Sequence, residues 1–167
     1  MQKEFLLKYQ EITDFNLVTD SEKLLIQKAV EIASKAYAPY SNFNVGAALI
    51  LDNEKIITGN NQENVSFPCG ICAERVALFT ARSNFPKALI KKIAITAVPK
   101  DFNLTDPVGP CGLCRQVLVE YEEKQVNDIE ILLFDTKKII KIARAKDLLP
   151  FHFQEKNLKR KNEKNII

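Results

Sequence analysis

Three cysteines and one glutamate stand at spacings that suit a metal site able to activate water. Glu74 lies two residues after Cys72, and Cys111 and Cys114 follow later in the chain, three residues apart. Three thiolates leave a tetrahedral zinc ion one position for water, and a carboxylate beside that water can move its protons. The pattern predicts one zinc ion held by Cys72, Cys111 and Cys114, with Glu74 as catalytic acid and base.

The residue before Cys111 indicates which reaction the predicted zinc site performs. Pro110 stands directly before Cys111, so this segment has the pattern Pro-Cys-x-x-Cys. Zinc deaminases combine that pattern with an earlier His or Cys ligand and a glutamate that does not bind the metal. Cys72 supplies the Cys form of the first ligand. The sequence therefore favours hydrolytic removal of an amino group.

A fourth cysteine leaves other interpretations open. Cys69 forms a second Cys-x-x-Cys pair with Cys72, and four cysteines can make a closed structural zinc site without room for water, as in a zinc-stabilised binding module. The long gap between the pairs, where about 15–20 residues is usual, counts against this site. A redox pair of Cys111 and Cys114 would need neither Cys72 nor the nearby glutamate.

Length and composition are typical of one globular domain. The 167 residues are 46% hydrophobic and 27% charged, which is ordinary for such a domain. No apolar run approaches the roughly 18 residues of a spanning helix, and the start of the chain lacks the layout of a secretory signal. We expect a cytoplasmic protein without membrane contact, whose cysteines bind metal or do chemistry.

The positive charge of the chain is concentrated at one end. The net charge is +3, and residues 154–167 hold five basic and two acidic residues, which accounts for the whole excess. A protein that grips a nucleic-acid backbone should show a basic face on its folded body. We predict a single domain over 1–153, whose first 15 or so residues give no clear signal, and a basic polar tail over 154–167. A solvated end is the simpler role for this tail, with a nucleic-acid contact as the alternative.

Hydrophobic periodicity predicts alternating helices and strands. Helices are expected from about residue 20 to before Pro39, at 71–83 and at 111–122. Strands are expected at 45–51, 55–59, 90–98, 128–134 and 138–143, with a short last helix at 145–149. This order predicts an α/β fold, a three-layer α/β/α sandwich with a mixed five-stranded sheet. Two helices would begin at the cysteines, where the partial positive charge of a helix N-terminus favours thiolates.

Segments spread over most of the chain resemble the cytidine and deoxycytidylate deaminase family, specifically the small homotetrameric cytidine deaminases. They are PYSNFNVGAA (39–48), GNNQEN (59–64), CAER (72–75), PCGLCRQ (110–116) and LLPFHF (148–153). The resemblance implies the family's fold, one Zn²⁺ per chain and a homotetramer. It also implies hydrolysis of cytidine and deoxycytidine to uridine and deoxyuridine with release of ammonia, a reaction of pyrimidine salvage.

The resemblance also implies roles for residues that bind substrate, and the charge of three thiolates suggests a role for an arginine. By position, Asn61 and Glu63 would hold the sugar hydroxyls, and Phe43 would pack on the base. Arg75 would hydrogen-bond the thiolates and return positive character to a zinc ion that carries three of them; Arg115 is a second candidate for this role. The alternatives are loop stabilisation for Asn61 and Glu63, core packing for Phe43, and a surface or interface position for Arg75.

The first zinc ligand bears on the substrate. Relatives that act on nucleotides or tRNA usually carry His where this chain has Cys72, and the carboxylate of Glu63 would repel a phosphate. A free nucleoside is therefore the expected partner, with no nucleic-acid polymer. His152, the only histidine, is expected at a surface or interface, and Phe153 either enters a neighbouring subunit's site or packs in the core. The alternative enzyme is an aminonucleoside antibiotic deaminase of the blasticidin type, which shares the Cys-x-Glu motif.

Overall fold

The structure, a computed structural model, describes residues 1–155 and 158. Three α-helices form in this part of the chain, α1 (Asp20–Ala33), α2 (Ala73–Asn84) and α3 (Gly112–Lys124). The strands are β1 (Tyr9–Ile12), β2 (Phe43–Leu51), β3 (Ile56–Asn60), β4 (Ile90–Pro99), β5 (Glu130–Phe134) and β6 (Ile139–Ile142). Short 3₁₀ turns occur at Phe15–Leu17, Phe67–Cys69 and Ala145–Leu148.

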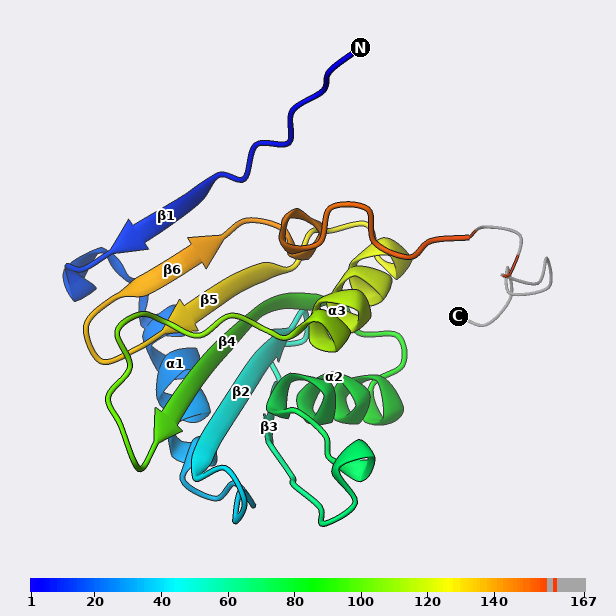
Figure 1. Cartoon of the computed structure of the whole chain (residues 1–167). Helices are drawn as coiled ribbons and strands as arrows, with labels where there is room; N and C mark the ends of the chain where they lie inside the picture. Colours follow the sequence, from blue (N-terminus) through cyan, green and yellow to red (C-terminus); the bar gives the residue numbers. More distant parts are fainter. Residues whose placement is uncertain (156–157, 159–167) are drawn as a thin grey trace.

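The strands form one mixed sheet between two layers of helix. The strand order is β1-β6-β5-β4-β2-β3, and β4 and β5 are parallel while the other neighbours are antiparallel. Helix α1 covers one face of the sheet, and α2 and α3 lie on the other (Figure 1). This confirms the predicted three-layer α/β/α architecture.

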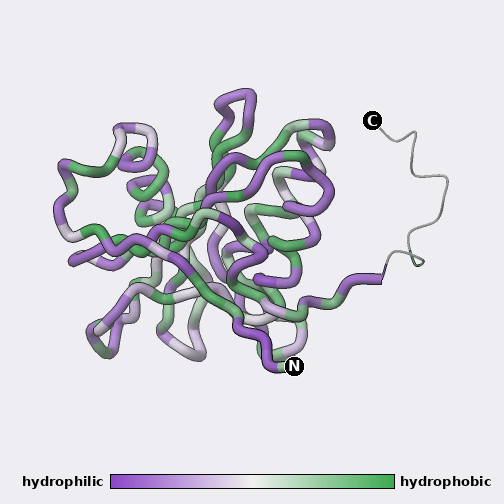
Figure 2. Tube along the Cα trace, turned by 90° about the horizontal axis from the view of Figure 1, so that it is seen from above, coloured by the Kyte–Doolittle hydropathy of each residue, from purple (hydrophilic) through white to green (hydrophobic). Residues whose placement is uncertain are grey.

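Strand β2 contributes side chains to the core on both faces of the sheet. Ala47, Leu49 and Leu51 belong to the cluster under α2 and α3, whereas Ala48 belongs to the cluster under α1. Because side chains alternate along a strand, a central strand covered on both faces is apolar throughout. In Figure 2, hydrophobic residues predominate along the central strands, and hydrophilic residues are common in the protruding loops.

One glycine lets the helix that follows Cys72 lie directly on the sheet. A Cβ added to Gly59 in β3 would come within 2.5 Å of the carbonyl oxygen of Ala73 and of the amide nitrogen of Ala77. Only a residue without a side chain allows this approach. The first turn of α2 is thereby held against β3.

The sheet has one strand more than the five expected. The additional strand, β1, pairs antiparallel with β6 and lies in the first 15 residues, for which no element was predicted. Its residues are exposed except for the half-buried Ile12, so no buried face produced an alternating pattern. Helix α1 also ends at Ala33 rather than near Pro39, and β2 begins two residues earlier than expected.

Of the predicted tail, only residues 154, 155 and 158 are described, and the rest of it lies outside the described residues. No helix in the described part of the chain is long and apolar enough to span a bilayer.

A buried carboxylate ties α1 to the sheet. The side chain of Glu22 is 4% exposed and accepts hydrogen bonds from Lys92 of β4 (2.8 Å) and Lys141 of β6 (2.6 Å). It also closes a capping box with Thr19 at the start of α1. Burial alone would raise the pKa of Glu22, but the hydrogen bonds from Lys141 and Lys92 outweigh it and hold this pKa well below its ordinary value. The ionised form is therefore the stabilising one.

Replacing this carboxylate should destabilise the protein in a pH-dependent way. A carboxyl group whose pKa falls on folding stabilises the fold above its unfolded pKa and loses that contribution as the pH falls. We expect Glu22→Gln to lower the free energy of unfolding by about 2–3 kcal/mol at pH 7, because the half-buried ammonium groups of Lys92 and Lys141 lose one of their two carboxylate partners and keep only Glu130. The difference from wild type should shrink below about pH 4.

Urea unfolding at one fixed protein concentration, at neutral and acidic pH, measures this effect. Glu31→Gln is the matched control, since Glu31 lies on the same helix but pairs with Lys28 at the surface. Equal stability of the two variants at pH 7 would contradict the assigned role of Glu22.

Candidate metal centre and active site

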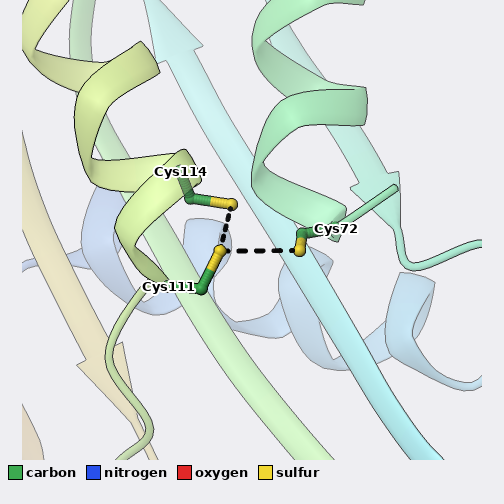
Figure 3. Close-up of side chains that lie close together, drawn as sticks. All are labelled: Cys72, Cys111 and Cys114. Carbon is green, nitrogen blue, oxygen red and sulfur yellow. Dashed lines mark hydrogen bonds between the residues drawn. The ribbon is translucent and has the colours of Figure 1, made fainter. Parts of the chain in front are cut away.

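The three cysteines predicted to bind zinc come together where two helices begin. Cys72 is the N-cap of α2, Cys111 is the N-cap of α3, and Cys114 lies in the first turn of α3. Figure 3 shows the three side chains pointing toward one another between the two helix N-termini. The amide groups of a helix N-terminus carry partial positive charge. Both helices therefore favour the thiolate form of these cysteines.

The sulfur separations suit a single zinc ion. The Sγ atoms of Cys72 and Cys111 are 3.8 Å apart, and those of Cys111 and Cys114 are 3.5 Å apart. All three lie within 4.8 Å of one another. Thiolates bound to one tetrahedral zinc at about 2.3 Å would be about 3.8 Å apart. The donor set and its spacing therefore fit Zn²⁺, and these separations are far too long for a disulfide.

The fourth cysteine is not part of this group. Cys69 is exposed in the short turn before α2, and among the described residues the sulfur cluster contains Cys72, Cys111 and Cys114 without Cys69. The arrangement is that of a three-thiolate site and not of a closed site with four sulfurs.

Arg75 lies beside the sulfurs, as the resemblance implied. Its Nη2 atom donates to the Sγ atom of Cys72 at 3.9 Å, and its Nε atom is buried without a hydrogen-bond partner. Hydrogen bonds from Cys114 and Arg75 lower the pKa of Cys72 to about 5. Arg115, the second candidate, donates instead to the backbone carbonyls of Pro110 and Leu148. Of the two arginines, Arg75 is the one placed to offset thiolate charge.

Glu74 is held in the first turn of α2 next to the sulfur cluster. Its side chain is buried, with 4% of the residue exposed, and its pKa is affected by Cys72 and by a hydrogen bond with Cys114. Burial raises the pKa of Glu74 above its ordinary value. A carboxyl group with a raised pKa takes up and releases a proton more easily near neutral pH. This is the property needed for proton transfer at the site.

Asn61 and Glu63 are brought next to the cysteines by a backbone pair. The backbones of Gln62 and Ile71 exchange two hydrogen bonds of 2.9 Å. Asn61 and Glu63 flank Gln62, while Cys72 directly follows Ile71. The segment predicted to hold the sugar therefore lies beside the predicted zinc site.

Both of these polar side chains also bind the backbone at the start of β2, Asn61 within the strand and Glu63 in the loop before it. The Asn61 side chain accepts from the backbone N–H of Val45 at 2.7 Å and donates to the carbonyl of Phe43 at 2.9 Å. Glu63 accepts from the backbone N–H of Tyr40 and from the hydroxyl of Ser41. The hydrogen bond from the Ser41 hydroxyl is the main reason that the pKa of Glu63 is lowered. The structure therefore contains the backbone contacts expected if Asn61 and Glu63 stabilise the local chain.

Phe43 lies at the start of β2, half-buried. It shares a strand face with Val45, which packs against the core cluster under α2 and α3. The ring of Phe102 stacks on it. Phe102 was not among the residues singled out from the sequence, because an aromatic residue in a polar loop carries no periodic signal.

The C-terminal segment is fastened to α3, the helix that carries two of the cysteines. Gln116 donates to the carbonyl of Phe153 at 2.9 Å and accepts from its N–H at 3.0 Å. His152 lies 3.0 Å from Glu123 on the same helix. The ring of Phe153 is 72% exposed, so this side chain is not packed in the core of the single chain.

Comparison with known proteins agrees with this geometry. Residues 19–128 match the family model described as the cytidine and deoxycytidylate deaminase zinc-binding region. The chain is 37% identical over 136 residues to a cytidine deaminase of Halalkalibacterium halodurans, covering 81% of this chain and 96% of that protein. It is 35% identical over 130 residues to a cytidine deaminase of Mycobacterium tuberculosis, covering 78% and 87% of the two chains.

Solved structures show the same similarity. The crystal structure of a cytidine deaminase from Burkholderia pseudomallei aligns with a TM-score of 0.68 and 38% identity, covering 78% of this chain and 98% of that one. A cytidine deaminase structure from Mycobacterium tuberculosis aligns with a TM-score of 0.63 and 32% identity, covering 80% and 97%. With its zinc motifs inside the matched region, the chain belongs to the cytidine and deoxycytidylate deaminase family.

Proposed function

We propose that this protein hydrolyses cytidine and deoxycytidine to uridine and deoxyuridine with release of ammonia, using one Zn²⁺ per chain. The observation that carries the proposal is the grouping of Cys72, Cys111 and Cys114 within 4.8 Å, beside the buried carboxyl group of Glu74. Three sulfur ligands leave one coordination position for water. A pyrimidine salvage role is consistent with this reaction.

Glu74 is the proposed general acid and base. Zinc, when bound, lowers the pKa of a water molecule towards neutrality. Glu74 accepts a proton from the water that attacks C4 of the base, and passes it to N3. It then takes the remaining proton from the new hydroxyl group on C4 and gives it to the departing amino group, which leaves as ammonia while the C4 carbonyl forms. One buried carboxyl group of raised pKa can serve in both directions.

The other proposed roles concern binding and charge. Arg75, through its contact with Cys72, offsets part of the negative charge of three thiolates. Asn61 and Glu63 hold the sugar hydroxyls, and Phe43 packs on the base. The ionised Glu63 supports a nucleoside over a nucleotide, because a carboxylate accepts strongly from a hydroxyl but repels a phosphate.

A homotetramer is proposed from the exposed apolar surface near the site. Large apolar side chains remain exposed on α2, at the start of α3 and in the loop before α2; they are Phe79 (44%), Leu113 (65%), Val65 (79%) and Phe67 (74%). Exposed apolar groups gathered near one another mark interaction sites. Contact with another copy through this side would cover them and would also shield the exposed Cys111. The exposed Phe153 would take part in such a contact.

We also propose a cytoplasmic location. All four cysteines are free thiols, and a site that binds metal through thiolates suits a reducing compartment.

The substrate proposal is tested by following ultraviolet absorbance of purified protein with cytidine, deoxycytidine, CMP and blasticidin S. We expect turnover of cytidine and deoxycytidine. Glu74→Gln should keep its zinc and lower kcat by about 10²–10⁴-fold, since it loses the proton carrier without losing a ligand. Turnover of CMP but not cytidine would contradict the proposed substrate class, and turnover of blasticidin S alone would favour the antibiotic deaminase.

The ligand assignment is tested by measuring bound zinc in cysteine variants. We expect one zinc per chain in wild type and in Cys69→Ser, but strongly reduced zinc in Cys72→Ser and Cys114→Ser, each of which removes one of three thiolates. Cys69→Ser is the matched control, because the same atom is changed a few residues from Cys72. Loss of zinc from Cys69→Ser would show a closed four-cysteine site.

The oligomer proposal is tested by light scattering after size-exclusion chromatography. Wild type should have the mass of four chains, and Phe79→Lys should yield smaller species, because a charge would be placed in an apolar interface. Val126→Lys is the control, since Val126 is 97% exposed in the loop after α3. A monomeric wild type, or an unchanged tetramer in Phe79→Lys, would contradict the proposed interface.

A further inference from the structure

The loop between β4 and α3 contributes an aromatic ring to the region proposed to bind the base. Phe102 stacks on Phe43 with ring centroids 6.1 Å apart and 23° between the ring planes. We propose that Phe102 is a positioning residue for the reaction: it supports the ring of Phe43 and so sets the affinity for the nucleoside. This inference rests on the proposed function, in which Phe43 packs on the base.

Phe102 is 57% exposed, so burial in the core does not account for its place. The position of Phe102 is set by hydrogen bonds of the two residues that precede it. The backbone N–H of Lys100 donates to the carbonyl of Asn42 at 3.0 Å, and the side chain of Asn42 donates to Asp101 at 3.1 Å. Two contacts to one residue thus hold the start of the loop next to Phe43.

Asn42, which makes both of these hydrogen bonds, has an unusual backbone conformation. Asn42 has φ of +52°, the left-handed region that asparagine tolerates better than most residues. It lies one residue before Phe43 and one after Ser41, whose hydroxyl donates to Glu63. The Phe102 loop, the Phe43 ring and the proposed sugar-binding carboxylate therefore belong to one connected unit.

Phe102 belongs to a groove on the face of the sheet that α1 covers. The groove, of about 700 Å³, is also lined by α1 residues such as Ile26 and Val30, and α1 lies on the face opposite to α2 and α3. The cysteines lie at the N-termini of α2 and α3. Phe102 can therefore back the Phe43 ring while the ring remains available to a base near the zinc site.

This placement predicts a specific kinetic effect. Phe102 contacts neither the cysteine cluster nor Glu74 in the contacts described, so its loss should leave the chemical step intact. A support that holds Phe43 equally in the ground state and the transition state changes KM and not kcat. Phe102→Ala should raise KM for cytidine about three- to tenfold, the range of one aromatic pair, with kcat within about twofold of wild type.

A double-mutant cycle tests whether Phe102 acts through Phe43. KM and kcat for cytidine are measured in wild type, Phe102→Ala, Phe43→Ala and the double variant. We expect the effect of Phe102→Ala to be lost in the Phe43→Ala background, because coupled neighbours are non-additive. If Phe43→Ala fails to fold, Phe43→Leu takes its place. Phe5→Ala, which removes a phenylalanine of similar exposure (55%), should leave KM unchanged.

Fluorescence gives a readout that does not depend on turnover. The chain has no tryptophan, so Phe102→Trp introduces a single reporter that keeps an aromatic ring against Phe43. We expect this variant to retain a KM close to wild type. Uridine, the proposed product, should change its emission, and Phe43→Ala in the same background should abolish that change.

The possible outcomes separate this inference from the proposed function. If wild type does not deaminate cytidine, the proposed function fails, and the inference falls with it. If wild type is active but Phe102→Ala leaves KM unchanged, or the two substitutions act additively, the inference alone is overturned. A kcat loss larger than the KM effect would also overturn it, since Phe102 would then act on the chemical step or on the fold.

Discussion

The meeting of two helix N-termini over one face of the sheet is the constraint on which the site depends. Cys72 caps α2, and Cys111 caps α3, so the two backbone turns that start these helices also fix the positions of the sulfur atoms. The close approach of α2 to Gly59 holds one of these starts against the sheet. Without that packing, the first thiolate would have no fixed distance to the other two.

The same arrangement balances the negative charge of the site as well as fixing the positions of the sulfur atoms. Three thiolates and a buried carboxyl group form a cluster of negative potential, which would be costly without compensation. The helix N-termini, the guanidinium of Arg75 and the zinc ion supply the compensating positive charge. Glu74 needs its burial, since burial raises its pKa, whereas Glu63 in the open loop is held ionised by hydrogen bonds. The carboxyl groups of Glu63 and Glu74 are thus suited to different tasks.

The sequence predicted those parts of the molecule in which chemistry or burial leaves a regular pattern. Each half of the metal motif is local in sequence, so the pattern pointed to the three cysteines and Glu74, and the apolar runs predicted the strands that are covered on both faces. Strand β1 was missed because it lies at the edge, where three of four residues are exposed. Phe102 was missed because its proposed role comes from a contact between a loop and the start of β2, and no pattern within one segment reports such a contact. The predicted roles of Asn61, Glu63 and Phe43 came from family resemblance, and the hydrogen bonds of Asn61 to β2 and of Glu63 to the loop before it could only be seen in three dimensions.

The central claim is that the zinc ion has three sulfur ligands and one position left for water. X-ray absorption at the zinc edge of the purified wild-type protein tests this most directly, because it counts sulfur and oxygen neighbours separately. The account predicts three sulfur atoms at about 2.3 Å and one oxygen atom at about 2.0 Å. Four sulfur neighbours would contradict it, since an ion saturated by thiolates has no place for the water that the reaction consumes.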